Sequence, residues 1–347
     1  MASRPNIVPQ QGKEERNRVI LGDIGNLEAA REVEIKTNFC DQPLTNAQAA
    51  TESNKVACGL TKKPNEQIVD NIDAGDVDNE LAVVEYIEDI YNFYRRVENE
   101  RRPNASYMES QPEIDQTMRA ILVDWVIEVH VHLTRFHFSI ETLYLTINII
   151  DRFLSLITVP MRELQLVGVT AMLMASKYEN NSKAPDVNFF VELSDETCSH
   201  EQILSMEKII LKKLEWNLSV PTPFVFLVRF IKASSIRDPD EAVENMAHFL
   251  CELGMMHYAT LQYCPSMIAS SAVFAARCTL NKSPSWNHTL EMHTGYSQQQ
   301  LMDCATLLVS FHCRARNGKH KAVLYNKYSN PERGAVVMLP PAQNLVL

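Results

Sequence analysis

The sequence predicts an all-α protein in which a disordered N-terminal arm is followed by an N-terminal helix and two tandem five-helix units. Three observations lead to this prediction. The chain has only 10 glycines in 347 residues, which is few for a sheet protein rich in turns. Apolar residues recur at helical spacing from Leu81 onward, without a convincing alternating strand pattern. Residues 1–78 lack any such periodicity and contain one aromatic side chain, Phe39.

The first 78 residues are rich in Asn, Gln, Thr and Glu and end in an acidic run. A segment of this composition cannot bury enough apolar surface to offset the entropy lost on ordering, so we expect a disordered arm. The N-terminal helix begins near Leu81 and is expected to end before Pro103. Its apolar positions at helical spacing are Val84, Ile87, Tyr91 and Tyr94.

Ten further helices are expected, in two sets of five separated by a linker at Val220–Pro223. The first set covers 114–131, 140–155, 161–179, 186–194 and 199–215. The second set covers 223–234, 239–256, 265–280, 286–292 and 297–315. The third helix of each set is crowded with Ala, Ser and large aliphatic residues. Because small side chains allow several neighbours to approach closely, we expect this helix to lie at the centre of each unit.

One helix contains an arginine in an unexpected place. The segment Met118–Val129 is apolar nearly all round a helical wheel, which is typical of a buried helix. Arg119 nevertheless projects between Val123 and Val126, within the apolar surface. An unpaired guanidinium would be very costly there, so we expect an acidic partner from elsewhere in the chain. The alternative is that Arg119 extends to solvent.

The bulk properties exclude several classes of function. A net charge of −10 disfavours nucleic acid as the main partner, because phosphate binding needs a basic surface. The eight cysteines are widely spread without a CxxC pair, and no signal peptide is present, which indicates reduced thiols in the nucleus or cytoplasm. No apolar run approaches the roughly 20 residues of a membrane span. No nucleophile–base constellation or phosphate-binding loop appears, so neither enzymatic activity nor a cofactor is expected.

Several blocks of the sequence closely resemble the cyclin box of A- and B-type cyclins. These blocks are MRAILVDW, ETLYLTINIIDRFLS, LQLVGVTAMLMASKYE, HEQILSMEKIILKKLEW and VPTPFVFLVRF. Two later blocks, YCPSMIASSAVFAARCTLNKSPSWN and KYSNPERGAVVMLPP, look most like plant mitotic B-type cyclins. The resemblance covers about residues 84–342 and implies two tandem five-helix cyclin folds. We therefore expect an N-terminal cyclin box at 79–219 and a C-terminal cyclin fold with its tail at 220–347.

The resemblance also implies a function. Cyclins do not catalyse a reaction themselves; they bind and activate a cyclin-dependent serine/threonine kinase, here at the transition from G2 to mitosis. The cyclin docks a kinase helix inward and so completes a Lys–Glu pair in the kinase active site. By resemblance, Lys177 and Glu207 form the charged pair that reaches this helix. Arg119 is expected to form a buried ion pair with Asp151 of the DRFL segment.

A second surface is implied by A-type cyclins, in which the helix that carries the MRAIL block captures Arg-x-Leu motifs of substrates and inhibitors. A small apolar groove would take the leucine, and Glu128 would face the arginine. The matching positions are Met118, Ile121, Leu122, Trp125, Glu128 and Gln165. The alternative is that this apolar stripe is ordinary core.

The arm contains one specific sequence motif, RVILGDIGN at residues 18–26. It fits Arg-x-x-Leu-x-x-Ile-x-Asn, the full destruction box that the anaphase-promoting ubiquitin ligase recognises. The four defining positions are Arg18, Leu21, Ile24 and Asn26. The motif predicts ubiquitin-mediated destruction at mitotic exit. The basic pairs in the arm are too sparse to indicate a nuclear import signal, and we expect the protein in both nucleus and cytoplasm.

Two segments depart from the family pattern. Residues 130–141 are about three residues longer than the expected turn. His130, His132 and His137 lie there, but no acidic or cysteine ligand accompanies them, so no metal site is expected. Residues 180–183 replace a Glu, an aliphatic and an aromatic residue beside the expected kinase-facing surface.

These departures leave two alternatives to weigh. A divergent cyclin paralogue would bind a kinase weakly or without activating it. A protein resembling transcription factor IIB, which also has two cyclin folds, would need a zinc ribbon and a basic second repeat. The sequence has no CxxC pair and is acidic, so it disfavours this second alternative.

Overall fold

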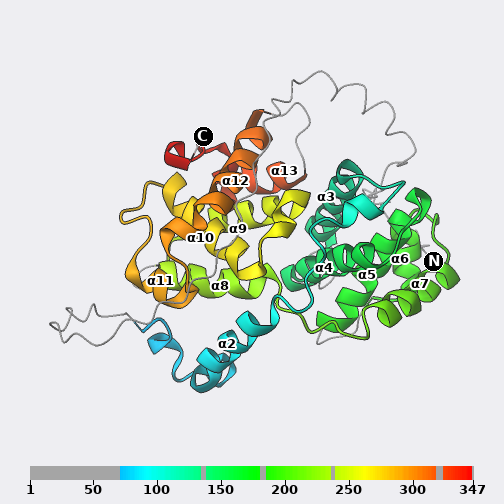
Figure 1. Ribbon diagram of the computed structural model, residues 1–347, viewed down its shortest axis with the longest axis horizontal. Coiled ribbons are helices and arrows are strands. Elements are labelled where there is room, and N and C mark those ends of the chain that lie inside the picture. The colour runs from blue at the N-terminus through cyan, green and yellow to red at the C-terminus, as the bar shows by residue number, and fades with distance from the viewer. Residues whose placement is uncertain (1–70, 134–137, 180–184, 236–238, 318–322, 346–347) are drawn as a thin grey trace, which may run out of the picture.

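A computed structural model describes residues 71–133, 138–179, 185–235, 239–317 and 323–345. Every regular element in these ranges is a helix, which confirms the all-α prediction for the described part of the chain. The helices form two bundles that lie side by side, and the N-terminal helix α2 crosses beneath them in the view of Figure 1. No helix in these ranges is long and apolar enough to cross a membrane.

Each bundle contains five helices, as the sequence predicts. The first consists of α3 (Gln116–Leu133), α4 (Ile140–Leu156), α5 (Leu164–Glu179), α6 (Val187–Leu193) and α7 (His200–Lys213). The second consists of α8 (Pro223–Ser234), α9 (Glu241–Met256), α10 (Pro265–Thr279), α11 (His288–Thr294) and α12 (Gln298–Asn317). The ends agree closely with the expected ranges because the sequence marks several of them. Pro223 and Pro265 occupy first turns, where proline is favoured, and a capping box at Ser199 starts α7.

The third helix of each bundle is its centre, as its small residues predict. Helix α5 packs against α3, α4, α6 and α7, and α10 packs against α8, α9 and α12. Residues 167–176 of α5 and 268–279 of α10 are all buried. At Gly168, an added Cβ atom would lie 2.7 Å from Leu122 Cδ1, so a larger residue would require the buried Leu122 side chain to shift.

The N-terminal helix is shorter than predicted. Helix α2 covers Ile87–Val97, and the 3₁₀ turns Glu80–Ala82 and Val84–Tyr86 precede it. Val83 between these turns has a φ of 48°, a left-handed conformation that interrupts a regular helix and that β-branched residues rarely adopt. The expectation that the helix runs from Leu81 is therefore wrong, because the apolar spacing carries no information about this backbone break.

The folded region begins earlier than the predicted boundary at residue 78. Ile72 is buried, and the Asp73 carboxylate accepts hydrogen bonds from Arg229 Nη1 at 2.5 Å and Lys232 Nζ at 2.7 Å, both on α8. Asp73 and Asp76 therefore hold this segment against the second bundle, so it does not belong to the arm. The remainder of the predicted arm, residues 1–70, lies outside the described residues.

Helix α2 contacts the second bundle, although its sequence position assigns it to the first unit. The Tyr91 hydroxyl donates to the Val225 carbonyl at 2.9 Å. The buried Glu98 carboxylate accepts from the Ser266 backbone amide at 2.8 Å and from its hydroxyl at 2.7 Å. The chain thus crosses from the second bundle back to the first through the connection between α2 and α3.

A short helix that the sequence pattern did not reveal, α13 (Val323–Ser329), joins the two bundles near the C-terminus. The Val323 amide donates to Asp124 Oδ1 on α3 at 3.0 Å. Lys327 Nζ lies 2.6 Å from Glu252 Oε2 on α9, and both side chains are buried. The expected tail is therefore an ordered part of the interface between the bundles.

Candidate functional site

A charged pair connects two helices on the surface of the first bundle. Lys177 in the last turn of α5 places its Nζ atom 2.7 Å from Glu207 Oε1 in the middle of α7. The lysine side chain is 42% exposed and the glutamate side chain 14% exposed. A cation in the last turn of a helix is favoured by the helix dipole, which helps to hold Lys177 at this position. The two residues expected to reach the kinase are therefore side by side, with the lysine exposed and the glutamate largely covered.

Two exposed aromatic side chains lie close in the chain to this pair, and the sequence reasoning did not identify either. Tyr178 is 46% exposed and its hydroxyl hydrogen-bonds Ser219, while Trp216 is 73% exposed. Trp216 has a φ of 61°, in the left-handed turn that ends α7. A tryptophan placed just after a predicted helix end, where apolar periodicity no longer requires it, was the available signal.

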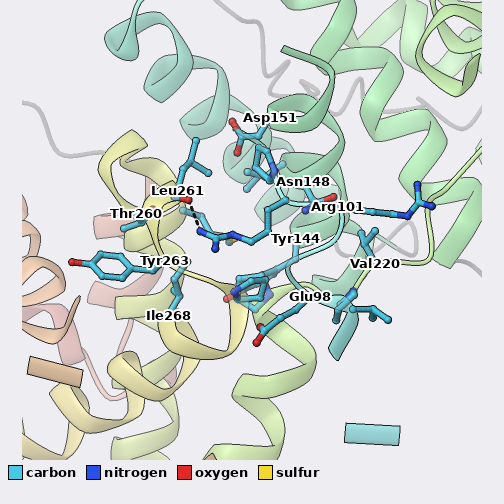
Figure 2. A pocket seen from close by; sticks show the side chains of 18 of the residues that line it. Glu98, Arg101, Tyr144, Asn148, Asp151, Val220, Thr260, Leu261, Tyr263 and Ile268 are labelled. Carbon is cyan, nitrogen blue, oxygen red and sulfur yellow. Dashed lines mark hydrogen bonds between the residues drawn. The ribbon is translucent and has the colours of Figure 1, made fainter. Parts of the chain in front are cut away.

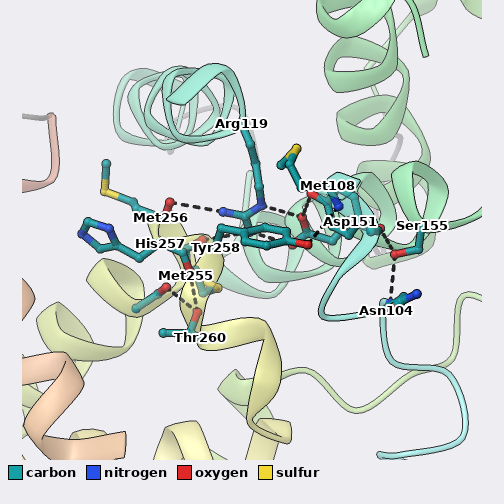
Figure 3. A network of polar contacts seen from close by, with 12 residues as sticks. Asn104, Met108, Arg119, Asp151, Ser155, Met255, Met256, His257, Tyr258 and Thr260 are labelled. Carbon is teal, nitrogen blue, oxygen red and sulfur yellow. Dashed lines mark hydrogen bonds and ion pairs between the residues drawn. The ribbon is translucent and has the colours of Figure 1, made fainter. Parts of the chain in front are cut away.

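The expected partner of Arg119 is present in the structure (Figure 3). Arg119 Nε donates to Asp151 Oδ1 at 2.6 Å and Arg119 Nη2 donates to Asp151 Oδ2 at 2.7 Å, which is a bidentate ion pair. Arg119 is 1% exposed and Asp151 is 3% exposed. Although burial opposes it, the charge of Asp151 raises the pKa of Arg119 above its ordinary value. The pair joins α3 to α4.

The same guanidinium reaches the second bundle. Arg119 Nη1 donates to the Met256 carbonyl at 3.2 Å and Nη2 donates to the Met255 carbonyl at 3.1 Å, both at the end of α9. The Tyr107 hydroxyl donates to Asp151 Oδ1 at 2.9 Å. Burial, followed by the charge of Asp151, raises the pKa of Tyr107. Arg119 therefore connects the two bundles as well as two helices within the first one.

The expected docking patch is largely buried. Met118, Leu122 and Trp125 are 6%, 0% and 3% exposed, so these three side chains belong to the core of the first bundle. The remaining three positions, Ile121, Glu128 and Gln165, are half-buried. Three of the six expected positions therefore lie in the core of the first bundle, and the docking role of the six positions stays a prediction.

Several expected features lie outside the described residues. They are the destruction-box residues Arg18, Leu21, Ile24 and Asn26, the departure at 180–183, and His137. In the segments that the structure does describe, no group of three or more His, Cys, Asp or Glu side chains could hold a metal ion. His130 is buried and His132 is exposed at the end of α3.

A small cavity lies where α2, α4 and the loop between α9 and α10 meet (Figure 2). Tyr144 and Asn148 of α4, Leu261 of the loop and Ile268 of α10 are among its lining residues. Its volume is about 70 Å³. A cavity of this size holds a few water molecules and is smaller than one known to bind benzene. This cavity is therefore too small for an organic substrate or cofactor.

The sequence and the fold match a known family. The chain matches the family models "Cyclin, N-terminal domain" over residues 89–219 and "Cyclin, C-terminal domain" over residues 221–342. It is similar to the X-ray structure of a viral cyclin from herpesvirus saimiri, with a TM-score of 0.53 and 21% identity, over 63% of this chain and 96% of that chain. This structural likeness concerns the fold alone. The chain belongs to the cyclin family, whose members are regulatory subunits rather than enzymes.

Two relatives indicate which class of cyclin this chain resembles. The G2/mitotic-specific cyclin S13-6 of Glycine max is 66% identical over 302 residues, which are 87% of this chain and 64% of that protein. Cyclin-B1-2 of Arabidopsis thaliana is 52% identical over 323 residues, which are 92% of this chain and 70% of that protein. These similarities support a mitotic B-type cyclin of the plant kind. The chain spans about two thirds of the length of these relatives.

Proposed function

We propose that this cyclin binds and activates a cyclin-dependent serine/threonine kinase and thereby promotes the transition from G2 to mitosis. The observation that carries the proposal is the Lys177–Glu207 pair at the surface, with Lys177 exposed and the exposed rings of Tyr178 and Trp216 near it in the chain. Exposed aromatic side chains are enriched among the residues that dominate binding energy at protein interfaces. We infer that these four residues form the kinase-binding surface.

The charged pair suits the recognition of a kinase helix for a physical reason. Lys177 and Glu207 fix each other at 2.7 Å, so part of the side-chain entropy that binding would remove is already lost in the free protein. Tyr178 is fixed in the same way by its hydrogen bond to Ser219. A partner therefore meets a partly preorganised surface.

The test is co-purification of the kinase with variants of the full chain. Replacing both Lys177 and Glu207 with Ala should abolish co-purification, and Trp216→Ala should weaken binding by about 2 kcal/mol or more, roughly 30-fold. Lys208→Ala is the matched control, because Lys208 is an exposed cation on the same helix. Circular dichroism should show unchanged helical content in all variants. Normal binding and activation by the double variant would refute the assignment.

The alternative function is that of a divergent paralogue that binds a kinase weakly or does not activate it. It is motivated by residues 180–183, which depart from the family pattern beside Lys177. A linker-histone kinase assay on the captured complex distinguishes the two functions. Histone phosphorylation supports activation, whereas a co-purified but inactive kinase supports the alternative.

We further propose that Arg-x-Leu segments of substrates or inhibitors dock beside α3. Trp125 Nε1 and Gln165 Nε2 are buried without a hydrogen-bond partner in the described structure, and each could donate to the backbone of a docked segment. Binding would require movement of the buried side chains that cover the leucine site. Glu128→Gln should weaken a fluorescent Arg-x-Leu peptide without affecting one that lacks the arginine. Equal effects on both peptides would argue against this site.

We propose that the arm brings the protein to the anaphase-promoting ubiquitin ligase through Arg18, Leu21, Ile24 and Asn26. The support is the match of all four positions to the full destruction-box pattern. Destruction at mitotic exit would then switch off the associated kinase. We also propose a distribution between nucleus and cytoplasm, which imaging of the tagged chain in dividing cells would test.

A further inference from the structure

A basic cleft lies where the connection between α2 and α3, the end of α4 and the end of α7 meet. Its volume is about 250 Å³. The charged residues that line it are Arg101, Arg102, Arg152 and Lys213, with Glu100 and Glu215 as the acidic members. Cations therefore outnumber carboxylates in this cleft, although the chain as a whole has a net charge of −10.

Arg152 is the central cation. It is 6% exposed, and its Nη1 donates to the Asn217 backbone carbonyl at 2.9 Å. No carboxylate forms an ion pair with Arg152 among the described residues. Burial, together with the nearby charge of Arg101, lowers the pKa of Arg152 to about 10. A buried guanidinium without an acidic partner is destabilising, and an anionic ligand would relieve this cost.

Arg101 also contacts Asn217, through the side-chain amide rather than the backbone. With the amide of Asn217 turned so that its oxygen faces Arg101, that oxygen accepts from Nη1 and Nη2 at 2.8 Å each. The Arg101–Glu215 distance is 3.9 Å, and the glutamate side chain is 80% exposed. A long, solvent-exposed ion pair of this kind contributes little to stability. Two guanidinium groups thus meet at Asn217, and neither is closely neutralised.

We propose that this cleft binds a phosphate monoester presented by a phosphorylated serine or threonine of a partner protein. A phosphomonoester carries nearly two negative charges at neutral pH, which match the two guanidinium groups. Guanidinium groups bind phosphate oxygens through paired hydrogen bonds. The acidity of the rest of the chain opposes a polyanion such as nucleic acid and leaves room for a single, locally presented phosphate.

Arg102 has a different role in the cleft. Its Nη2 atom donates to the Leu261 carbonyl at 2.8 Å and its Nη1 atom donates to Asn99 Oδ1 at 3.1 Å. These bonds fix Arg102 against the second bundle. The phosphate site is therefore assigned to Arg101 and Arg152, with Lys213 at the rim.

The proposal is tested on the full chain without any kinase, so the result is independent of the proposed function. The probes are the peptide acetyl-Gly-phosphoSer-Gly-amide, its unphosphorylated counterpart, and inorganic phosphate at matched ionic strength. Binding is followed by the NMR signals of the Arg101 and Arg152 Nε–H groups. The phosphopeptide should shift both signals saturably, and the unphosphorylated peptide should not.

Three variants separate binding from folding. Arg101→Gln and Arg152→Gln should each weaken the phosphopeptide about tenfold, because one charge-assisted contact is lost. Glu215→Gln should tighten binding about twofold, since it removes a competing acid. Arg162→Gln, an exposed arginine outside the cleft, is the control and should bind like the wild type. Arg152→Gln should also raise the melting temperature of the ligand-free protein, because it removes a buried charge without a partner.

Specific outcomes would overturn the proposal. Absence of a saturable shift, or equal binding by the Arg101→Gln variant and the wild type, would remove the phosphate site. Equal affinity for inorganic phosphate and the phosphopeptide would overturn the assignment to a phosphorylated protein. A lower melting temperature of Arg152→Gln, with unchanged binding, would show that Arg152 serves only to hold Asn217.

Discussion

The buried Arg119–Asp151 pair gives the sharpest prediction, and Arg119→Ala is the perturbation. This change removes two charge-assisted hydrogen bonds to Asp151 and two bonds to the carbonyls of Met255 and Met256. The Asp151 carboxylate would remain buried with only the Tyr107 hydroxyl as a side-chain donor. Removing one partner of a buried pair costs about 3–5 kcal/mol. A protein of more than 250 residues shifts by about 2 °C or less per kcal/mol, so we expect a fall in melting temperature of roughly 5–10 °C.

A second variant shows whether the cost comes from the unpaired charge. Arg119→Met combined with Asp151→Leu removes both charges and fills the space with apolar atoms. The Tyr107 hydroxyl then lacks its acceptor, which costs about 1–3 kcal/mol. The double variant should therefore be less stable than the wild type and more stable than Arg119→Met alone.

The assay is urea unfolding followed by circular dichroism, with Arg162→Ala as the exposed control. The control should lie within about 0.5 kcal/mol of the wild type. An unchanged free energy of unfolding for Arg119→Ala would refute the structural role of the pair. A double variant as unstable as the sum of its single variants would show that the two side chains act independently.

Three further predictions concern pH and destruction. Burial raises the pKa of Asp124 to about 6, so the protonated carboxyl stabilises the folded state at low pH, and this stabilisation should be lost as pH rises from about 4 through 6. Asp124→Asn should therefore stabilise the protein by up to about 3 kcal/mol at pH 8, measured by urea unfolding. Burial lowers the pKa values of His130 and His257 to about 4, so stability should fall as pH drops from 6.5 to 4, measured by thermal melts. Replacing Arg18 and Leu21 with Ala should lengthen the protein's life after metaphase without affecting kinase activation, measured by its abundance through synchronised mitotic exit.

Each of these predictions has a contrary outcome. An Asp124→Asn variant no more stable than the wild type at pH 8 would mean that Asp124 is well solvated. A flat stability profile of the Asp124→Asn variant between pH 6.5 and 4, in which the opposing contribution of Asp124 is absent, would contradict the burial of the neutral histidines. Equal decay of the arm variant and the wild type would place the destruction signal elsewhere in the chain.

The sequence alone determined where the ten helices of the two bundles lie, because apolar spacing, proline positions and caps act within a few residues, but it did not reveal α13 or the true start of α2. Helix α8 covers Pro223–Ser234 and α4 begins at Ile140, as predicted. The acidic partner of Arg119 could also be predicted, since a buried cation on an apolar helix requires a buried carboxylate whatever the fold. The same reasoning was available for Glu252, an acid within the apolar part of α9 whose partner proved to be Lys327.

Tertiary structure alone decided which apolar side chains are buried and which helix covers them. The stripe of Met118, Leu122 and Trp125 is buried, whereas Tyr178 and Trp216 remain exposed, and local periodicity does not distinguish these two results. The packing of α2 on the second bundle and the bridge made by α13 depend on contacts more than 100 residues apart for Tyr91 and Val323. A sequence pattern states that a face must be covered, but the covering element is chosen by the three-dimensional arrangement of all the others.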